Sequence, residues 1–113
     1  MLRKKDYSKQ LEKNVIIDSS VSIFKALGDE TRLQILNALL NGALTVSEIT
    51  NRTMVSQSCV SHQLKLLKEL RIVKSERRGK CILYSLDDQH IIDIITITYA
   101  HVEERAGEND EEI

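Results

Sequence analysis

The sequence has 113 residues, of which 42% are hydrophobic and 29% are charged, and its net charge is −1. A chain of this length forms one small domain with a modest core. It contains no run of about 20 apolar residues that could span a bilayer, and its first ten residues, MLRKKDYSKQ, lack the apolar stretch of a signal peptide. We therefore expect a cytoplasmic protein with no membrane partner.

The charges are strongly segregated along the chain. Residues 55–80 carry seven basic side chains and two acidic ones, whereas residues 87–113 carry nine acidic side chains and one basic one. A basic block indicates a polyanionic partner, although a solvated surface is the commoner reason for any single run of charge. We expect residues 1–14 to be a polar extension, residues 15–106 to form the domain, and residues 107–113 to be a disordered acidic tail.

The two cysteines, Cys59 and Cys81, are too few for a disulfide framework and do not have the spacing of a zinc ribbon. We expect reduced thiols that serve as small core residues.

Two helices are predicted in the first part of the domain. The first has apolar residues at helical spacing, Val21, Phe24 and Leu27, and closes at Gly28. The second starts at the cap Asp29 and stops at Asn41-Gly42, with Leu33, Leu36 and Leu40 on one face.

The next two predicted helices follow each other closely. Thr45 and Glu48 form a T-x-x-E capping box, which starts a short helix through Ile49. A further helix runs from Ser56 to about Arg71. Only a few residues, NRTMV, link the two, so together they form a helix-turn-helix candidate.

After the fourth predicted helix, the pattern of apolar residues changes from that of a helix to that of β-strands. Two runs of β-forming residues in 72–86 flank Arg78-Gly79-Lys80, which predicts a hairpin with glycine at its tip. Residues 87–104 are rich in β-branched side chains but contain no glycine or proline and are too long for a typical strand. We interpret them as a helix capped by Asp87 or Asp88.

The helix that begins at Ser56 has two distinct sides. At about 100° per residue, Val60, Leu64, Leu67 and Leu70 face the core. The opposite face is polar and basic and consists of Gln57, Ser58, Ser61, His62, Lys65 and Lys68. Such side chains can hydrogen-bond to base edges and phosphates, but a solvated face explains this helix alone equally well. The basic hairpin directly after it, with Arg77, Arg78 and Lys80, favours DNA binding.

Three stretches in order, ALGDETRLQILNALL, SQSCVSHQLKLLKEL and RRGKCILYSL, resemble the ArsR/SmtB metal-responsive repressors over residues 20–105. The resemblance implies a mainly α winged helix-turn-helix with a small β-hairpin wing, a homodimer formed through terminal helices, and a repressor of an imperfectly palindromic DNA operator. It also implies DNA contacts for Gln57, Ser58, Ser61 and His62. Met54 departs from the family, which more often has Gly or Asn there, and would be strained if the turn needs a positive φ.

His90 and His101 lie on one face of the last predicted helix, about 16 Å apart along its axis. One chain cannot bring them to one ion. The stripe between them is apolar, so the helix can pair antiparallel with its own copy and place Asp88 and His90 of one chain beside His101 and Glu104 of the other. Two imidazoles and two carboxylates suit Zn²⁺, with Co²⁺ as a surrogate. Surface or core roles are nevertheless the commoner fate of two such histidines.

The family resemblance favours the metal site. D-x-H followed by H-x-x-E is the ligand pattern of its zinc-sensing branch and matches Asp88, His90, His101 and Glu104. The Cys-x-Cys of its thiolate branch is absent, because residues 45–48 read TVSE. The resemblance further implies a hydrogen bond from the His101 ring to the carbonyl of Arg71, by which metal would reach the DNA-reading helix.

The predicted function is therefore a repressor released from its operator by zinc. The alternative within DNA binding is a redox sensor that uses Cys59 or Cys81 in place of metal. A metalloenzyme would need an open coordination position and a pocket, which the sequence does not supply, so we predict no enzymatic activity. A pure dimerisation module would leave the reading face and the basic hairpin without a role.

Overall fold

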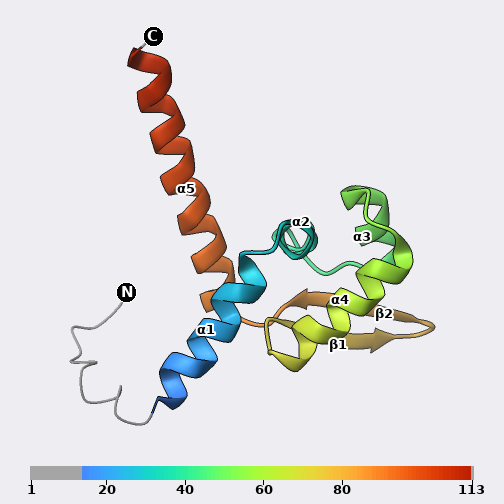
Figure 1. Cartoon of the computed structure of the whole chain (residues 1–113). Coiled ribbons are helices and arrows are strands. Elements are labelled where there is room, and N and C mark those ends of the chain that lie inside the picture. The colour runs from blue at the N-terminus through green and yellow to red at the C-terminus, as the bar shows by residue number, and fades with distance from the viewer. Residues whose placement is uncertain (1–13, 113) are drawn as a thin grey trace.

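The computed structural model describes residues 14–112, with side chains described as far as Gly107. The predicted polar extension lies outside these residues except for Asn14, which precedes the first helix. The elements, in chain order, are α1 (Val15–Leu27), α2 (Glu30–Ala38), α3 (Val46–Thr53), α4 (Gln57–Glu69), β1 (Val73–Arg78), β2 (Cys81–Leu86) and α5 (Gln89–Glu112). Helices α1 to α4 and the hairpin form one body, and α5 projects from it as a long single helix (Figure 1).

The core lies between the helices and the base of the hairpin. Its largest fully buried side chains are Ile35, Leu36, Ile49, Val60, Leu64, Leu67, Ile72 and Val73. They come from α2, α3, α4 and the residues at and just before the start of β1, so burial of this one cluster fixes the helix-turn-helix and the wing together. The predicted winged helix-turn-helix is confirmed.

Side-chain caps set the starts of α2 and α3. The Asp29 carboxylate accepts the backbone N–H of Arg32 at 3.0 Å. In the predicted capping box, Thr45 Oγ1 accepts the N–H of Glu48 at 3.2 Å, and Glu48 Oε1 accepts the N–H of Thr45 at 2.9 Å. The hydrogen bond that Glu48 accepts from the backbone N–H of Thr45 lowers the pKa of Glu48 most, and the side chain of Thr45 lowers it further. The box therefore stabilises α3 at neutral pH, and that contribution is lost as the pH falls through the folded pKa.

Two helix ends differ from the sequence prediction. Helix α2 ends at Ala38, before Leu40, and α3 continues to Thr53, beyond Ile49. The Thr53 hydroxyl donates to the carbonyl of Ile49 at 2.8 Å and accepts the N–H of Val55 at 3.3 Å, which ties the last turn of α3 to the link that follows. The link between the two helices is accordingly shorter than predicted.

The turn between α3 and α4 contains a strained residue. Met54 has φ 64°, in the left-handed region, and its side chain is 96% exposed. The predicted positive φ is therefore present, at a residue type that incurs a steric cost of about 1–2 kcal/mol in this conformation.

Replacing Met54 with glycine is expected to stabilise the protein by about 1 kcal/mol, because glycine adopts this φ without a Cβ clash. The thermal midpoint measured by circular dichroism should rise by roughly 4 °C. Met54→Ala is the matched control, since it removes the same exposed side chain but keeps the clash. Equal midpoints for the glycine and alanine variants would show that the turn is not strained.

Hydrogen bonds between nearby residues form both the C-terminal end of α4 and the hairpin that follows it. Arg71 has φ 58° and donates to the carbonyl of Lys68 at 3.0 Å, while Ile72 donates to Leu67 at 2.9 Å, which is a Schellman motif with arginine in the usual glycine position. Strands β1 and β2 pair antiparallel from Val73 opposite Leu86 to Arg78 opposite Cys81.

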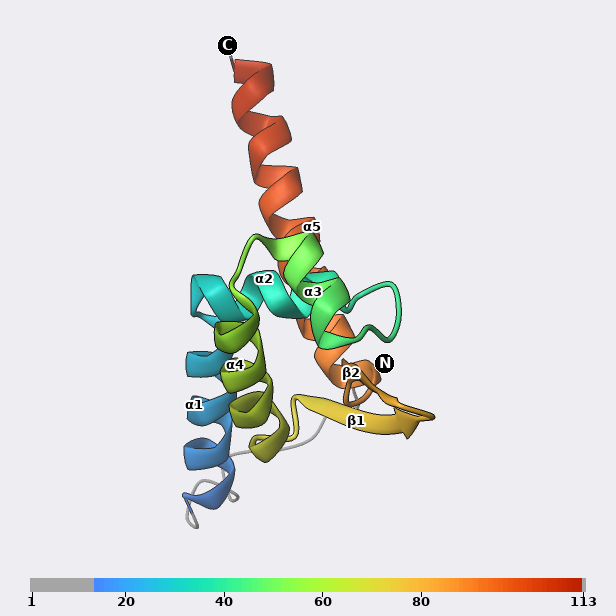
Figure 2. The ribbon, with the colours of Figure 1, turned by 90° about the vertical axis from the view of Figure 1, so that its right-hand side faces the viewer.

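The tip of the hairpin is a two-residue turn, Gly79-Lys80, in which Gly79 has φ 61°. Glycine is the residue that hairpin turns need at such a position, as predicted. Along the other edge of β2, Leu44 and Tyr84 exchange two backbone hydrogen bonds at 2.9 and 2.8 Å, so the loop before α3 adds a bridge to β2. The hairpin extends away from the helices beside α4 (Figure 2).

Two further expectations are wrong. Cys81 is exposed and Cys59 is only partly buried, so neither is a core residue. The backbone of α5 is helical as far as Glu112, whereas a disordered tail was expected after Gly107. Helix α1 is only partly in the core, because Ala26 is buried and Leu27 packs against the core, whereas Phe24 is 62% exposed. No helix in the described part of the chain is long and apolar enough to cross a membrane.

Candidate DNA-reading surface and metal site

Helix α4 presents the polar face that its sequence predicts. The exposed residues of this reading face are Gln57, Ser58, Ser61, His62, Lys65 and Lys68. On the opposite side Val60, Leu64 and Leu67 are fully buried, and Leu70 packs against them. Ser56 caps the helix by accepting the N–H of Cys59 at 3.3 Å. Burial of one side thus fixes which side chains α4 offers to a partner, and they suit the major groove of DNA.

The wing carries the second group of predicted DNA contacts. Arg77, Arg78 and Lys80 are all exposed near its tip. Arg78 Nε donates to Glu76 Oε1 at 2.7 Å, and this hydrogen bond with the carboxylate raises the pKa of Arg78. Arg77 makes a longer contact, 3.4 Å, to the carbonyl of Gly79. The wing therefore offers three basic side chains that can contact phosphates, although Arg78 is already paired with the Glu76 carboxylate.

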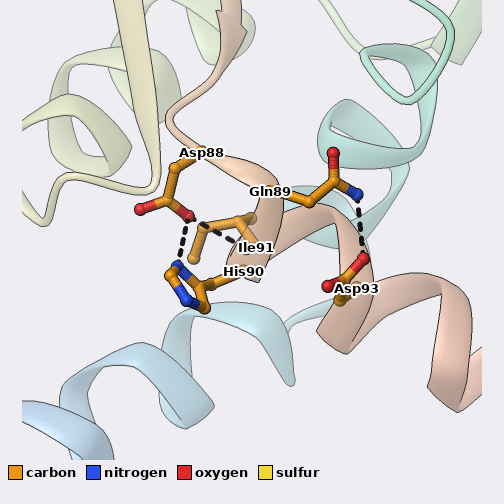
Figure 3. A network of polar contacts seen from close by, with 5 residues as sticks. All are labelled: Asp88, Gln89, His90, Ile91 and Asp93. Atoms are coloured by element: carbon orange, nitrogen blue, oxygen red, sulfur yellow. Dashed lines mark hydrogen bonds and ion pairs between the residues drawn. The ribbon is translucent and has the colours of Figure 1, made fainter. Parts of the chain in front are cut away.

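The N-terminal end of α5 holds half of the predicted metal site. Asp88 caps the helix, as its Oδ1 accepts the N–H of Ile91 at 3.3 Å, and the same oxygen lies 3.5 Å from His90 Nδ1 (Figure 3). The His90 side chain is 90% exposed. Gln89 and Asp93 form a separate hydrogen bond of 2.8 Å on another side of the helix. Asp88 and His90 are therefore adjacent and open to solvent, with the second Asp88 oxygen outside both contacts.

The other half, His101 and Glu104, is exposed further along α5. Eleven residues of helix separate His90 from His101, about 16 Å along the axis. Within the described residues, one chain brings no three histidine, cysteine, aspartate or glutamate side chains together as a metal-binding group. The structure thus brings together only Asp88 and His90, while His101 and Glu104 lie about one helical turn apart further along α5.

The fold also exposes an apolar face, of which the sequence predicted the part on α5 but not the part on α1. Large hydrophobic side chains on α1 and α5 are open to solvent: Val15, Ile16, Ile17, Val21, Phe24, Ile97 and Val102. A hollow between the two helices is lined by Phe24, Leu27, Leu33, Ile95 and Tyr99 together with neighbouring residues. An apolar patch of this kind marks an interaction surface. The apolar spacing in α1 was visible in the sequence, but what covers it was not.

The sequence is similar to a family of bacterial regulatory proteins and to individual transcriptional regulators. Residues 29–75 match the family model described as bacterial regulatory protein, arsR family. The chain is 39% identical over 105 residues to the cadmium resistance transcriptional regulatory protein CadC homolog of Staphylococcus aureus, covering 92% of this chain and 83% of that one. It is 38% identical over 81 residues to the transcriptional repressor SmtB homolog of Synechocystis sp., covering 72% and 61%.

The fold matches a solved winged helix-turn-helix. The homodimeric DNA-binding domain of a possible ArsR-family regulator from Mycobacterium bovis superposes with a TM-score of 0.78 at 24% identity, covering 94% of each chain. The matched relatives are transcriptional regulators rather than enzymes, as the sequence predicted. The chain belongs to the arsR family of bacterial regulatory proteins, DNA-binding transcriptional regulators with a winged helix-turn-helix.

Proposed function

We propose that this protein is a cytoplasmic, homodimeric repressor that binds an imperfectly palindromic operator and releases it when Zn²⁺ binds between the α5 helices of the dimer. The observation that carries the proposal is the arrangement of α5, with Asp88 and His90 exposed near one end, His101 and Glu104 exposed further along, and the exposed apolar Ile97 between them. The relatives named for cadmium resistance and SmtB support a metal as the inducer.

The exposed apolar face supports the dimer. Phe24 of α1 and Ile97 and Val102 of α5 are 62%, 67% and 59% exposed. A two-fold interface uses the same patch on both chains, and a helix with a central apolar stripe is self-complementary when it pairs antiparallel. Burying this face against a second copy would remove from water a surface that a single chain leaves open.

The donor set suits zinc. In an antiparallel pair, the Asp88 and His90 end of one α5 would meet the His101 and Glu104 end of the other, giving two nitrogen and two oxygen ligands at each of two sites. Zn²⁺ accepts this set in four-coordinate geometry, with Co²⁺ as a good substitute and Ni²⁺ a poorer one. Asp88 can cap α5 through Oδ1 and still offer its other oxygen.

Release of DNA requires metal to favour the conformation with lower operator affinity. We propose that binding fixes the ring of His101, whose other nitrogen then hydrogen-bonds to the carbonyl of Arg71 at the exit of α4. Arg71 suits this role because the Schellman motif places it between the end of α4 and the start of the wing. A coupling of about 1–3 kcal/mol, or 5- to 150-fold in operator affinity, is typical of such switches.

The proposal is tested by fluorescence anisotropy on a DNA duplex selected from random sequence by the wild-type protein. Adding Zn²⁺ should weaken wild-type binding by at least fivefold. His101→Ala should bind the duplex as the wild type does, yet lose the response to Zn²⁺. Release of the His101→Ala variant by Zn²⁺ would refute the metal route.

A second candidate is a thiol-based redox sensor, favoured by one observation, the exposure of Cys81 on the wing. In that case hydrogen peroxide rather than Zn²⁺ would release the duplex. Substituting Cys59 and Cys81 with serine would then abolish the response. Under the zinc proposal, the same double variant should still respond to Zn²⁺ as the wild type does.

A further inference from the structure

Helix α2 stands between the helix proposed to sense metal and the helix that reads DNA. In the part of the chain that the structure describes, two side-chain hydrogen bonds join different helices, and both involve α2. Arg32 Nε donates to Gln63 Oε1 of α4 at 2.7 Å. The Tyr99 hydroxyl of α5 donates to Asn37 Oδ1 at 3.0 Å. The residues of α2 that make these bonds are five positions apart.

The bond from Arg32 is built to hold α4 in one orientation. Its donor is a permanent cation, its length is short, and both side chains are partly buried. Hydrogen bonds with a charged partner are roughly twice as strong as neutral ones. The backbone of Arg32 is itself fixed, since its N–H is held by the Asp29 cap at 3.0 Å. Gln63 directly follows His62 of the reading face, so the bond acts where α4 presents its side chains.

The bond from Tyr99 joins α5 to the other end of α2. Tyr99 is partly buried, and its hydroxyl makes the 3.0 Å hydrogen bond to Asn37. Tyr99 lies two residues before His101, and Asn37 lies one residue before the last residue of α2. Asn37 also borders a hollow with Arg52, Thr53 and Met54 at the turn that leads into α4.

We propose that α2 is a positioning element for operator binding, in which Arg32 sets the orientation of α4 through Gln63, and Asn37 links that orientation to α5 through Tyr99. Arg32 acts through Gln63 and does not itself contact phosphate. The part that concerns the inducer rests on the proposed zinc-dependent function.

The first test measures operator affinity for Arg32→Met, Gln63→Met and the double variant, using the selected duplex at several salt concentrations. Each single variant should bind roughly five- to tenfold more weakly, because the competent orientation of α4 becomes less populated. The double variant should bind no more weakly than either single one, and the salt dependence should stay unchanged.

Two results would overturn the role of Arg32. Unchanged affinity in both single variants would show that the bond does not position α4. A salt slope that falls by about 0.9 per contact in Arg32→Met, with losses that add in the double variant, would make Arg32 a direct phosphate contact. If Arg32→Met proves unstable by circular dichroism, Gln63→Met still tests the bond, because methionine fits the partly buried position of Gln63 on α4.

The second test compares Tyr99→Phe with wild type for Zn²⁺ affinity and for Zn²⁺-driven release of the duplex. Tyr84→Phe on the wing is the matched control. Tyr99→Phe should bind Zn²⁺ with normal affinity, but the factor by which Zn²⁺ weakens its binding to the duplex should be at least threefold smaller than in the wild type. In Tyr84→Phe this factor should be unchanged. Full release by Tyr99→Phe would overturn the link to α5. Absence of release in the wild type would instead refute the proposed function and leave the role of Arg32 to the first test.

Discussion

Two variants that each fail to bind metal are expected to recover one site when they are combined in a single dimer. His90→Ala and His101→Ala should each abolish binding as homodimers, because both sites of either dimer lack one imidazole. In the mixed dimer, His90 of one chain and His101 of the other remain and meet at the same site. We expect one Co²⁺ per mixed dimer, compared with two per wild-type dimer.

The measurement is a Co²⁺ titration of dimers that carry two different affinity tags, followed by displacement with Zn²⁺. Tetrahedral sites give strong d–d absorption, whose intensity at saturation counts the sites. The matched control dimer pairs a wild-type chain with a His90→Ala, His101→Ala double variant. It holds the same two substitutions, but each of its sites lacks one histidine, so it should bind no Co²⁺.

The two dimers therefore distinguish a site between chains from a site within one chain. If the ligands came from a single chain, the control would bind one ion and the mixed dimer none. The separation of about 16 Å along a rigid helix argues against that outcome. Octahedral-like weak bands in the wild type would remove the metal switch and make Cys81 the leading sensor.

Features determined by neighbouring residues were predictable from the sequence. The Thr45 and Glu48 capping box, the Asp29 cap and the Gly79 turn depend on a few residues of backbone, and each lies where it was predicted. The reading face of α4 was predictable for a related reason, since helical geometry and the buried leucines determine which side chains remain outside.

Features that depend on distant contacts were not predictable. Phe24 has the spacing of a core residue, but its burial depends on a surface that this chain alone does not supply. The hydrogen bond between Arg32 and Gln63 joins residues 31 positions apart, and no local pattern indicates it. The proposed metal ligands have a recognisable spacing, but the described residues of one chain bring no three of them together, and the proposed site would need a second copy.

Alanine at Arg77, Arg78 and Lys80 together is expected to remove most of the salt dependence that the wing contributes to DNA binding. If each basic residue neutralises one phosphate, a dimer loses six contacts, and the slope of log K against log salt should fall by about 5. Affinity at physiological salt should drop roughly a hundredfold or more. The measurement is fluorescence anisotropy of the selected duplex between low and physiological salt.

A variant of the reading face distinguishes phosphate contacts by the wing from base contacts by α4. Gln57→Ala on α4 should cost about 1–3 kcal/mol on the selected duplex and relax the sequence preference, with the salt slope unchanged. Glu76→Gln is the control on the wing, because it frees Arg78 from its 2.7 Å partner and should tighten binding by up to about fivefold. A wing variant that lost sequence preference but kept its salt slope would place the wing tip on base edges rather than on phosphates.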